Sequence, residues 1–493
     1  MLDKFGYIWY NFRRIGRCEY APCKVVHFEL PGWTFIWPDK ITLIWSFFTE
    51  RYRKVLIHMK KQFAKYVSLN ILGMVGLSCY VLADSYFIAK SQGAAGLTAL
   101  NLVLPVYNLI FAFGSMIGVG SAIRYTIAKS RDFKDADNYI FNSLFFAVFA
   151  GLVFSIIGIL FPEQLLGLLG ADSEIVETGR DYTRIFIACS PLFTVNYTVN
   201  AFVRNDNAPN TAMAATLVSS IFNIILDYVL MFPLKMGMSG AALATGLSPA
   251  VGILICSTHI FSGKSSIHIK PCIPSLKKLA ASCQVGFSAF VAEISSGVIT
   301  MTFNFLILNL AGNTGVAAYG IIANAALVAV AFFNGIAQGS QPLISRSFGE
   351  KKTGETDVLR KLSLVTAFTV GAVLYTVLAV FAEGISSVFN PEHDKLLQSY
   401  SVTGIRLYFT GILFSGINIA GSSFFSAVEN IKAAFTVSLL RGFVLILLFA
   451  FLLSAAFGIN GVWLAYAASE AVTSAFLFYF IRKGGYRAVC SSQ

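Results

Sequence analysis

The chain has 493 residues, of which 56% are hydrophobic and 13% are charged, and its mean hydropathy is +0.69. A soluble protein of this length needs far more charge to cover its surface, so the composition excludes a soluble fold. The formal net charge of +12 would suggest nucleic acid in a soluble protein, but here the basic residues stand in short gaps between apolar stretches. We therefore expect an integral membrane protein that binds no nucleic acid.

Residues 1–58 differ from the rest of the chain. They hold four of the five Trp residues, mixed charges and no clean apolar span. They also lack the apolar region and small-residue cleavage site of a signal peptide. At Met59 the sequence changes to Met-Lys-Lys-Gln-Phe-Ala-Lys-Tyr, a basic lead-in to an apolar helix. We expect Met59 to be the natural start and residues 1–58 to be an atypical extension; an interfacial amphipathic segment is the alternative.

Apolar windows long enough to cross a bilayer as helices follow Met59. The alternating ten-residue pattern of a membrane barrel is missing from the sequence, so a barrel is excluded. The predicted fold is an all-α integral membrane protein with twelve transmembrane helices. The windows lie near residues 66–90, 97–128, 139–161, 180–203, 211–233, 238–262, 280–310, 315–343, 361–388, 397–427, 433–457 and 460–482.

The distribution of charge predicts the orientation. Basic residues follow the second, sixth and eighth windows and end the chain, whereas the gap 162–179 holds four acidic residues and no Lys or Arg. Because basic loops stay in the cytoplasm, we expect a multi-pass protein of the cell (plasma or inner) membrane with both termini cytoplasmic. The basic residues are Lys129, Arg131, Lys134, Lys264, Lys270, Lys277, Lys278, Arg346, Lys351, Lys352, Arg360, Lys361, Arg482, Lys483 and Arg487.

The second half of the chain repeats the first. Gly120-Ser121 recurs as Gly339-Ser340, Phe161-x-Glu163 as Phe381-x-Glu383, and Gly237-x-x-Gly240-x-x-Leu243-Ala244 as Gly458-x-x-Gly461-x-x-Leu464-Ala465. Six spans per repeat is an even number, so the repeats are parallel, as in transporters whose halves rock about a central site. The expected domains are an N-lobe (59–262), a cytoplasmic linker (263–279), a C-lobe (280–485) and a tail (486–493).

Ionisable and polar residues inside the first repeat are the main candidates for function. Asn223 and Asp227 are four residues apart and share one helix face, and a fixed offset of 221 gives them the apolar counterparts Val444 and Leu448. Thr245 corresponds likewise to Tyr466. A carboxylate in hydrocarbon is costly and marks ion or proton pathways.

Asp84 lies late in the first window. At the interface it would serve only to cap the helix end; buried, it would exchange a proton or bind a cation. Asp84, Asn223, Asp227 and Thr245 together offer oxygen ligands for a monovalent cation or a shared proton. We predict that they form the coupling site.

Polar residues in the second repeat have weaker claims. Glu293 stands among Ser and Gly on a face that we expect water to reach, and we take it as a second-lobe acid. Gln338 and Gln341 either bond across helices or line a wet cavity. Arg441 and Glu470 are expected to form a structural ion pair within the bundle, since each charge neutralises the other.

Catalytic and metal-binding motifs are missing from the sequence. No phosphate-binding loop, HExxH or nucleophile elbow is present, and the eight Cys and five His are dispersed. We expect a protein that is not an enzyme, holds no metal or other cofactor and is not driven by ATP on its own.

These residues together resemble the MATE (multidrug and toxic compound extrusion) family, in particular its MepA-like branch. The resemblance covers about residues 59–485 and rests on the stretch around Asp84, Arg204-Asn205-Asp206, Asn223-Ile-Ile-Leu-Asp227, Gly240-Ala-Ala-Leu-Ala-Thr245 and Gly335-Ile-Ala-Gln-Gly-Ser-Gln-Pro342. It implies two six-helix lobes in a V that open alternately to each side. It also implies export of cationic amphipathic compounds against inward H⁺ or Na⁺, by a protein that we expect to be a monomer.

In the family, the first-span acid, the fifth-span Asn and Asp and the sixth-span Thr form the cation site, which implies that role for the four candidates above and a related one for Glu293. Two features depart from the family. The first span lacks the proline that bends it in some members, leaving Gly73 and Gly76, and the tenth-span acid of another branch is missing, with Asn418 the nearest polar residue. Coupling schemes that need either feature do not transfer.

Two other classes of function remain. A lipid-linked oligosaccharide flippase of the same broad superfamily would line its cleft with basic residues, of which few lie deep in the spans (Arg184, Arg406 and Arg441). A non-transporting receptor or scaffold would not need buried acids in one half only. The sequence leaves open the substrate and the choice between H⁺ and Na⁺.

Overall fold

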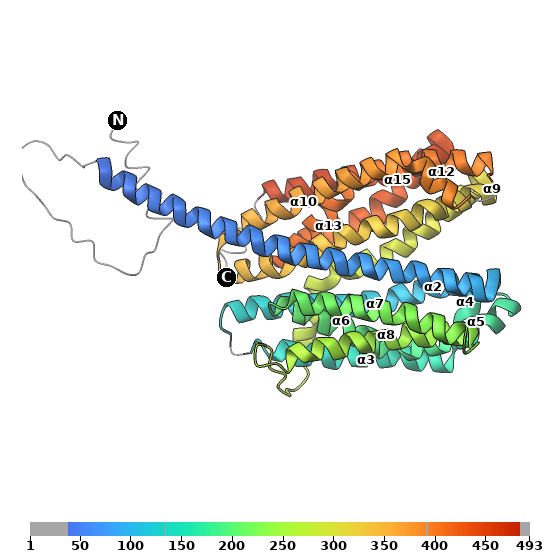
Figure 1. Ribbon diagram of the computed structural model, residues 1–493, viewed down its shortest axis with the longest axis horizontal. Coiled ribbons are helices and arrows are strands. Elements are labelled where there is room, and N and C mark those ends of the chain that lie inside the picture. Colours follow the sequence, from blue (N-terminus) through green and yellow to red (C-terminus); the bar gives the residue numbers. More distant parts are fainter. Residues whose placement is uncertain (1–37, 134, 391–392, 484–493) are drawn as a thin grey trace, which may run out of the picture. The chain divides into compact units, whose positions relative to one another are not determined.

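The computed structural model describes residues 38–133, 135–390 and 393–483. All regular elements in these ranges are helical, which confirms the predicted all-α class (Figure 1). The chain divides into two units between Met59 and Lys60, and each is described by itself. Of the first unit, only the helical residues 38–59 are described, so most of the predicted extension lies outside the described residues, as does the predicted tail. The predicted domain boundaries stay predictions.

The first bundle of the larger unit comprises residues 60–260. Its helices are α2 (Pro38–Ser130, which starts in the first unit), α3 (Asn138–Leu160), α4 (Pro162–Leu168), α5 (Ser173–Ala188), α6 (Ser190–Asn205), α7 (Pro209–Met231) and α8 (Gly237–Ile260). Gly93, at φ 66°, breaks α2 into two spans, because glycine adopts positive φ at little cost. Helices α5 and α6 meet at a bend of 43° and together form one broken span, in which Pro191 stands in the first turn of α6.

The second bundle comprises residues 276–483. Its elements are α9 (Leu276–Gly349), α10 (Thr353–Val380), α11 (Ala382–Val388), α12 (Lys395–Tyr408), the 3₁₀ turn η1 (Phe409–Gly411), α13 (Ile412–Ala427), α14 (Ile431–Leu439), the π-helical turn η2 (Leu440–Val444) and α15 (Leu445–Arg482). Gly312 in α9 and Gly458 in α15 break these helices, again with positive φ. Side chains cap the N-termini of several helices: Ser275 accepts from the Lys278 amide at the start of α9, and Asn430 accepts from the Ala433 amide at the start of α14.

The predicted twelve crossings agree with the structure. Among the described residues, nine helices are long and apolar enough to cross a membrane, or ten with the bent pair α5–α6. Helix α9 and the stretch 431–482 each contain a glycine break and supply two crossings apiece. Two predicted boundaries are wrong. The first candidate span starts at Leu56, inside helix α2, which already begins at Pro38, and α10 ends at Val380 because the chain turns at Phe381 into α11.

The repeat is visible in the backbone. Left-handed φ angles recur at matching places: Gly93 with Gly312, Asp132 with Lys351, Asn207 with Glu429, and Gly237 with Gly458. The short helix α4 likewise matches α11. Helices and turns at equivalent positions of the two halves end in the same left-handed conformation. This agreement is evidence that the fold is duplicated, and chance similarity in composition would not produce it.

The fixed offset of 221 residues between the repeats does not hold inside the span that contains Asn223 and Asp227. Val444 and Leu448 are 48% and 49% exposed, whereas Asn223 and Asp227 are 1% and 0% exposed, so the predicted counterparts are wrong. The left-handed pair Asn207 and Glu429 already sets the offset at 222 before this span, and the π-helical turn η2 then accommodates an extra residue. Buried apolar residues, Ile446 and Ala450, occupy the matching positions at the resulting offset of 223. The acid is still specific to the first bundle.

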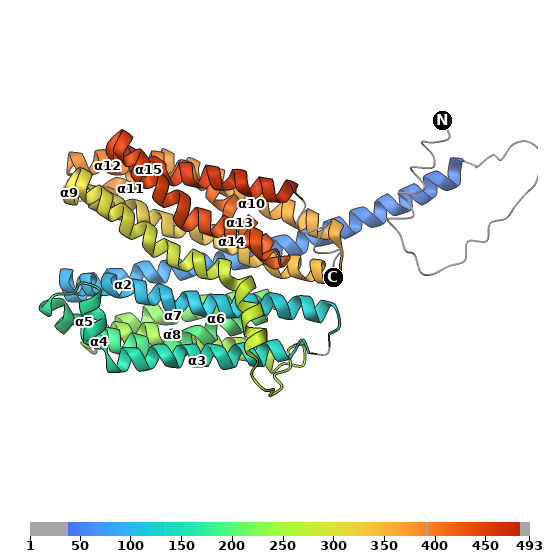
Figure 2. The ribbon, with the colours of Figure 1, turned by 180° about the vertical axis from the view of Figure 1, so that it is seen from behind.

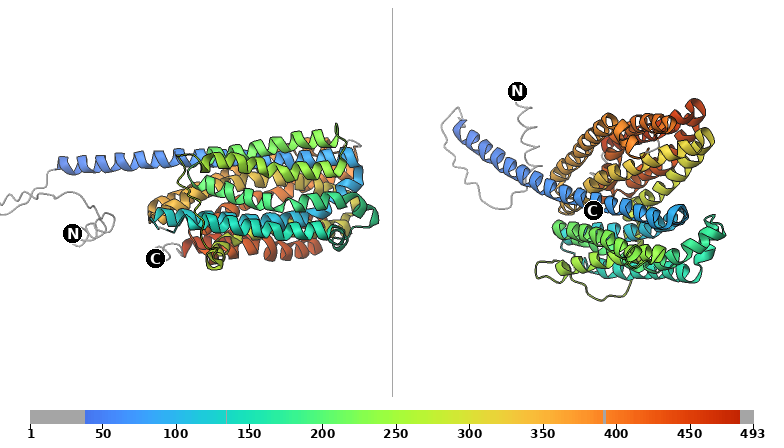
Figure 3. Two further views of the ribbon diagram at one scale, coloured as in Figure 1. Left: turned by 90° about the horizontal axis from the view of Figure 1, so that it is seen from below. Right: turned by 45° about the vertical axis from the view of Figure 1, so that its right-hand side comes forward.

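The two bundles lie side by side, with α2 to α8 in blue to green and α9 to α15 in yellow to red (Figures 1 and 2). We call the end with the 129–137, 205–208, 261–275, 349–352 and 428–430 segments the basic end; the glycine breaks at Gly93, Gly312 and Gly458 lie at the opposite end. A second pair of views shows the same two groups of helices (Figure 3).

Contacts between the bundles gather toward the basic end. A Cβ on Gly335 would clash with the backbone of Ile71, and a Cβ on Gly339 would lie 2.7 Å from the Cα of Val67. Beyond these close backbone approaches, Arg124 of α2 forms an ion pair with Glu429, at 2.7 Å. The basic halves of the two bundles are therefore packed together in this conformation.

Candidate functional site

The four residues predicted to bind a coupling ion are all buried in the first bundle. Asp84 lies on the first span of α2, Asn223 and Asp227 lie on α7, and Thr245 lies on α8. Helices α7 and α8 form the most extensive helix pair of the bundle, which fixes the last three residues together. The Asn223 Nδ2 atom donates to the Thr245 Oγ1 atom at 3.3 Å.

Four oxygen atoms of this cluster have no hydrogen-bond donor among the described residues. They are Oδ1 of Asp84, Oδ1 of Asn223 and both carboxylate oxygens of Asp227. Buried polar atoms are almost always paired, and an unpaired one costs about 1–3 kcal/mol, or more when it is charged. The cluster thus presents four unpaired acceptor oxygens, which suit a proton or a hard cation.

Asp84 and Asp227 are close enough for their charges to interact. Asp84 therefore does not stand at a helix end, as the structural alternative required: α2 continues past it to the break at Gly93. Two tyrosines, Tyr80 and Tyr182, interact electrostatically with both acids. Two like charges in a medium of low dielectric constant repel strongly, which favours taking up a positive charge between them.

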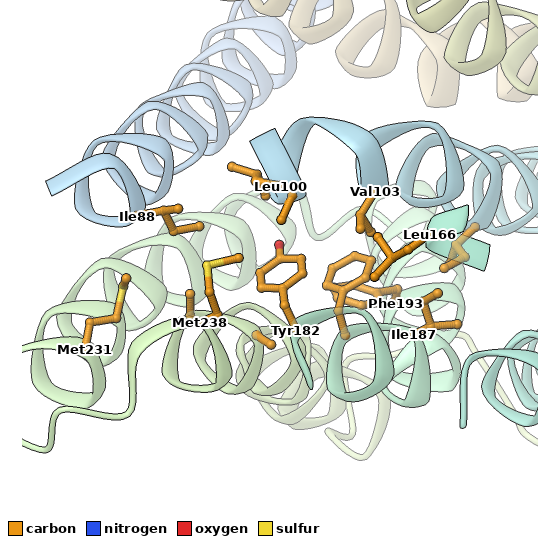
Figure 4. Close-up of a cluster of buried hydrophobic side chains, with 14 of the residues drawn as sticks. Ile88, Leu100, Val103, Leu166, Tyr182, Ile187, Phe193, Met231 and Met238 are labelled. Atoms are coloured by element: carbon orange, nitrogen blue, oxygen red, sulfur yellow. The ribbon is translucent and has the colours of Figure 1, made fainter. Parts of the chain in front are cut away.

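An apolar cluster closes the site toward the end opposite the basic end. Ile88 follows Asp84 by one turn, Met231 follows Asp227 by one turn, and both belong to one buried cluster with Met238 and Tyr182 (Figure 4). Figure 4 shows these side chains packed between α2, α7, α8 and α5. The cluster keeps the acids away from that end of the bundle and strengthens every charge interaction at the site.

Glu293 lies apart from this cluster, at the boundary between the bundles. It is half-buried on the first span of α9, and no hydrogen bond or ion pair is present for it in the described part of the chain. Its neighbours one turn away touch the first bundle: the Phe290 ring lies 5.3 Å from that of Phe113, and a Cβ on Gly297 would lie 3.5 Å from Asn108 Nδ2. Glu293 also interacts electrostatically with Tyr197.

Gln338 and Gln341 have different environments. Gln338 Oε1 accepts a hydrogen bond from Nη1 of Arg204, across the two bundles. The same Arg204 nitrogen lies 3.4 Å from Asn70 Oδ1, and its Nε has no acceptor among the described residues. Gln341 is buried, and its Nε2 likewise has no acceptor among the residues that the structure describes. Gln338 is therefore an inter-bundle contact.

Sequence reasoning used Arg204 only as part of a motif and missed its contact with the second bundle. Arg204 is 4% exposed although it is charged and, within the described part of the chain, has no carboxylate partner. The available signal was a basic residue placed within a span-like helix, since such charges are costly and rarely without a partner. Its partner, on a helix far away in the sequence, was not predictable from spacing.

Arg441 and Glu470 lie together inside the second bundle. The Arg441 Nε atom is 2.7 Å from Oε1 of Glu470, and the latter side chain is fully buried. Asn418 Nδ2 donates to the other carboxylate oxygen at 2.7 Å. Every oxygen of this acid thus has a donor, in contrast to Asp227. Among the described residues, no group of three or more His, Cys, Asp or Glu is arranged to hold a metal ion.

The fold and these sites together define a class: a multi-pass membrane carrier built from two parallel six-helix repeats. The MatE family model matches residues 70–229 and 289–470, on both bundles. The chain therefore belongs to the MATE family of multidrug efflux transporters, which confirms the resemblance found in the sequence.

Similar proteins agree with this assignment. The chain is 27% identical over 406 residues to the multidrug export protein MepA of Staphylococcus haemolyticus, covering 82% of this chain and 88% of that protein. It is 25% identical over 387 residues to MepA of Staphylococcus aureus strain MRSA252, covering 78% and 84%.

Solved structures are similar in fold. One, described as the outward-facing conformation of a multidrug resistance MATE family transporter of the MOP superfamily, gives a TM-score of 0.82 at 22% identity, covering 87% of this chain and 97% of that chain. A MOP superfamily transporter from Pyrococcus furiosus, described as having a binding pocket of reverse polarity, gives a TM-score of 0.80 at 21% identity, covering 88% and 96%.

Proposed function

We propose that this chain is a secondary antiporter that exports cationic amphipathic drugs in exchange for H⁺ or Na⁺. The observation that carries the proposal is the cluster of Asp84, Asn223, Asp227 and Thr245, with four buried oxygens that lack donors among the described residues. Such a cluster gains a large interaction energy when a cation enters and loses it when the cation leaves. The names of the MepA relatives support multidrug export.

The proposed orientation places the basic end in the cytoplasm, because basic loops remain on that side. The bundles are packed together at that end by Arg124–Glu429 and by the close approach of Gly335 to Ile71. The conformation described here then corresponds to an outward-facing state, which agrees with the described state of a similar solved structure. We further propose a monomer in the cell membrane, with both termini inside and Met59 as the natural start.

In the proposed cycle, the outward-facing state takes up H⁺ or Na⁺ at Asp84 and Asp227. Neutralising these acids weakens the binding of a cationic drug, which is released outside. The return to the inward-facing state releases the ion to the cytoplasm, and the emptied acids favour binding of the next drug. Reversing a population from 1:99 to 99:1 requires about 5.5 kcal/mol of differential binding, which two buried carboxylates can supply.

Glu293 has a second role in this proposal. It is an acid at the boundary between the bundles with no partner in the described chain, on a helix turn whose neighbours touch the first bundle. A cationic drug between the bundles would meet this carboxylate directly. We assign Glu293 to drug recognition and the first-bundle cluster to ion coupling.

The flippase alternative is less well supported by the basic residues that it needs. Arg406 pairs with Glu383 at 3.3 Å and both are exposed, whereas Arg441 pairs with Glu470 inside the second bundle. Arg184 is exposed and donates to the Ile159 carbonyl. These three guanidinium groups are engaged separately and do not form one basic surface that would hold a pyrophosphate.

The test is transport of a fluorescent organic cation into proteoliposomes, with pH and sodium gradients imposed separately. Asp84→Asn and Asp227→Asn should each abolish gradient-driven transport while the protein is still produced and folded. Asp181→Asn, an exposed acid on α5, is the matched control and should keep normal transport. Normal rates in both of the first two variants would remove these residues from the mechanism.

A further inference from the structure

The second bundle has a charged cluster at the same helix pair where the first bundle has its ion site. Thr245 of α8 corresponds to Tyr466 of α15, and residues 240–245 match residues 461–466 in burial, position by position. Pro249, one turn further along α8, corresponds to Glu470. Ser219 and Ser220 of α7 correspond to the region of Arg441 in η2, given the offset of 222 set by Asn207 and Glu429.

The two clusters differ in how their acids are satisfied. Glu470 accepts from Arg441 Nε on one oxygen and from Asn418 Nδ2 on the other, both at 2.7 Å. Asn418 is held in turn, because its Oδ1 accepts from Ser474 Oγ at 3.0 Å. In the first bundle, both oxygens of Asp227 lack a donor. The site in the first bundle therefore has acceptor oxygens with no cation beside them. The site in the second bundle has an acid, Glu470, whose cation is the side chain of Arg441.

The backbone conformation at η2 helps to fix the position of Arg441. Arg441 lies in the π-helical turn Leu440–Val444, a rare conformation that is often found at functional sites. The next residue, Gly442, packs against Ser295 of α9, where a Cβ would lie 2.5 Å from the Ser295 Cβ. Arg441 Nη2 also donates to Ser415 Oγ at 3.1 Å, and Tyr466 OH donates to the same oxygen at 2.8 Å. The guanidinium thus donates to two side chains, Glu470 and Ser415, and Tyr466 donates to the second of these.

Among the residues that the structure describes, no further acid forms an ion pair with Arg441. Tyr408 and Tyr466, whose rings stack at 4.3 Å, are the other titratable groups that interact with Glu470 and Arg441 in the described chain. The position that corresponds to Asp84 is Phe303, fully buried and packed against Tyr319 and Tyr408. The Arg441–Glu470 site therefore has one acid and one permanent cation, with charges that cancel.

We propose that Arg441 is a tethered cation that keeps the second bundle's site permanently filled, so that only the first bundle exchanges ions. The proposal rests on the proposed coupling role of Asp84 and Asp227. Removing the guanidinium should convert Glu470 and Asn418 into an exchangeable site, because a buried carboxylate without a counter-ion takes up a proton or a metal cation. Serine, the residue of the first repeat, is the natural replacement.

The first experiment measures cation binding to purified protein, as proton uptake with a pH indicator and as binding of radioactive sodium. The background is Asp84→Asn with Asp227→Asn, which should lose the proton and sodium binding of the first-bundle site if the proposed function is correct. Adding Arg441→Ser should restore one saturable site, and adding Glu470→Gln as well should remove it again. Arg441→Lys keeps the charge and should create no site.

The proposal would be overturned if the cation binding gained with Arg441→Ser persisted after Glu470→Gln was added. It would also be overturned if the Arg441→Ser and Arg441→Lys variants bound cations equally. Cation binding by the background variant that Glu470→Gln removes would also overturn it. Failure of the proposed function is distinguishable: in that case Asp84→Asn with Asp227→Asn binds ions as the unchanged protein does, whatever stands at position 441.

A second experiment does not leave a buried acid without its counter-ion. Arg441→Gln with Glu470→Gln removes both charges together and keeps polar side chains at both positions. The number of ions exchanged per drug, obtained from the drug accumulation that a known gradient supports, should be unchanged. A lower ratio in this double variant would show that Glu470 exchanges an ion, contrary to the proposal.

Discussion

Gly120 of the first bundle and Gly286 of the second lie in direct backbone contact. A Cβ on Gly120 would clash with the Ser282 carbonyl oxygen and would lie 2.8 Å from the Gly286 amide nitrogen, and a Cβ on Gly286 would clash with the Met116 carbonyl oxygen. Any side chain at either position would separate two helices that are otherwise in contact. The closure of the basic end therefore depends on these two residues having none.

Gly286→Val is accordingly expected to open the basic end and to reduce transport at least tenfold. Overpacking a close contact costs about 1–3 kcal/mol, enough to reverse an equilibrium between two states of similar energy. Pulsed electron paramagnetic resonance between labels at the basic ends of the two bundles measures the change. Gly320→Val is the matched control, since a Cβ at Gly320 meets no atom within 4 Å. An unchanged distance distribution in Gly286→Val would contradict the expectation.

The ion pair Arg124–Glu429 gives a second, electrostatic test of the same closure. Its 2.7 Å contact joins α2 to the turn after α13, and the Glu429 side chain is 6% exposed. Glu429→Gln leaves Arg124 without its carboxylate, so the ratio of closed to open protein should fall by roughly thirtyfold or more, in keeping with the roughly 2–5 kcal/mol lost when a buried charge loses its partner.

Exchanging the two charges should restore closure in part. Arg124→Glu with Glu429→Arg is the restoring variant, and Arg124→Glu alone is its control. Accessibility of a cysteine placed at the basic end to a membrane-impermeant reagent measures the open state. Equal accessibility in the single and exchanged variants would mean that the pair does not contribute to closure.

Most of the fold was predictable because bilayer crossings need long apolar stretches and duplicated sequence implies duplicated structure. The windows around α3, α7 and α8 agree with the helices to within a few residues. The continuation of helix α2 upstream of the first apolar window was not predictable, since a basic lead-in continues a helix without an apolar signal. The counterparts of Asn223 and Asp227 were assigned wrongly because a π-helical turn shifts register without any mark in the sequence.

The residues of the candidate site were predictable from the sequence, but the contacts around the site were not. Asp84 and Asp227 were found because carboxylates in apolar helices are rare. The contact of Arg204 with Gln338 was not found, since it joins helices from different repeats at no fixed spacing. The donors of Glu470 could be predicted only in part: charge pairing indicates Arg441, but nothing in the sequence indicates Asn418.

Within the ion site, the contact between Asn223 and Thr245 predicts a graded effect. Thr245→Val removes the acceptor of the Asn223 amide and one potential ion ligand, so the affinity for the coupling ion should fall about tenfold, for a loss of about 1–1.5 kcal/mol. The apparent affinity is measured as the ion concentration that gives half-maximal drug export. Thr258→Val, an exposed threonine of the same helix, is the control. Equal affinities in the two variants would exclude Thr245 from the site.

The segment that joins the two bundles is fixed to the first bundle by Asp206. This carboxylate accepts from His259 Nε2 at 2.9 Å, from Ser265 Oγ at 2.9 Å, and from both the amide and the hydroxyl of Ser266. The Ser266 carbonyl in turn accepts from Lys129 Nζ at 3.0 Å. Movement between the bundles should therefore bend the connecting segment after Ser266 and not at the end of α8.

Asp206→Ala should release this segment from the first bundle. Hydrogen bonds to a charged group contribute about 1.5–3 kcal/mol each, so amide exchange in residues 262–268 should accelerate at least tenfold, and trypsin should cleave faster after Lys264. Asp135→Ala, an exposed acid at the same end, is the control and should leave both rates unchanged. If exchange in 262–268 is as slow in Asp206→Ala as in the control, the segment is held by contacts other than this carboxylate, and the bend need not lie beyond Ser266.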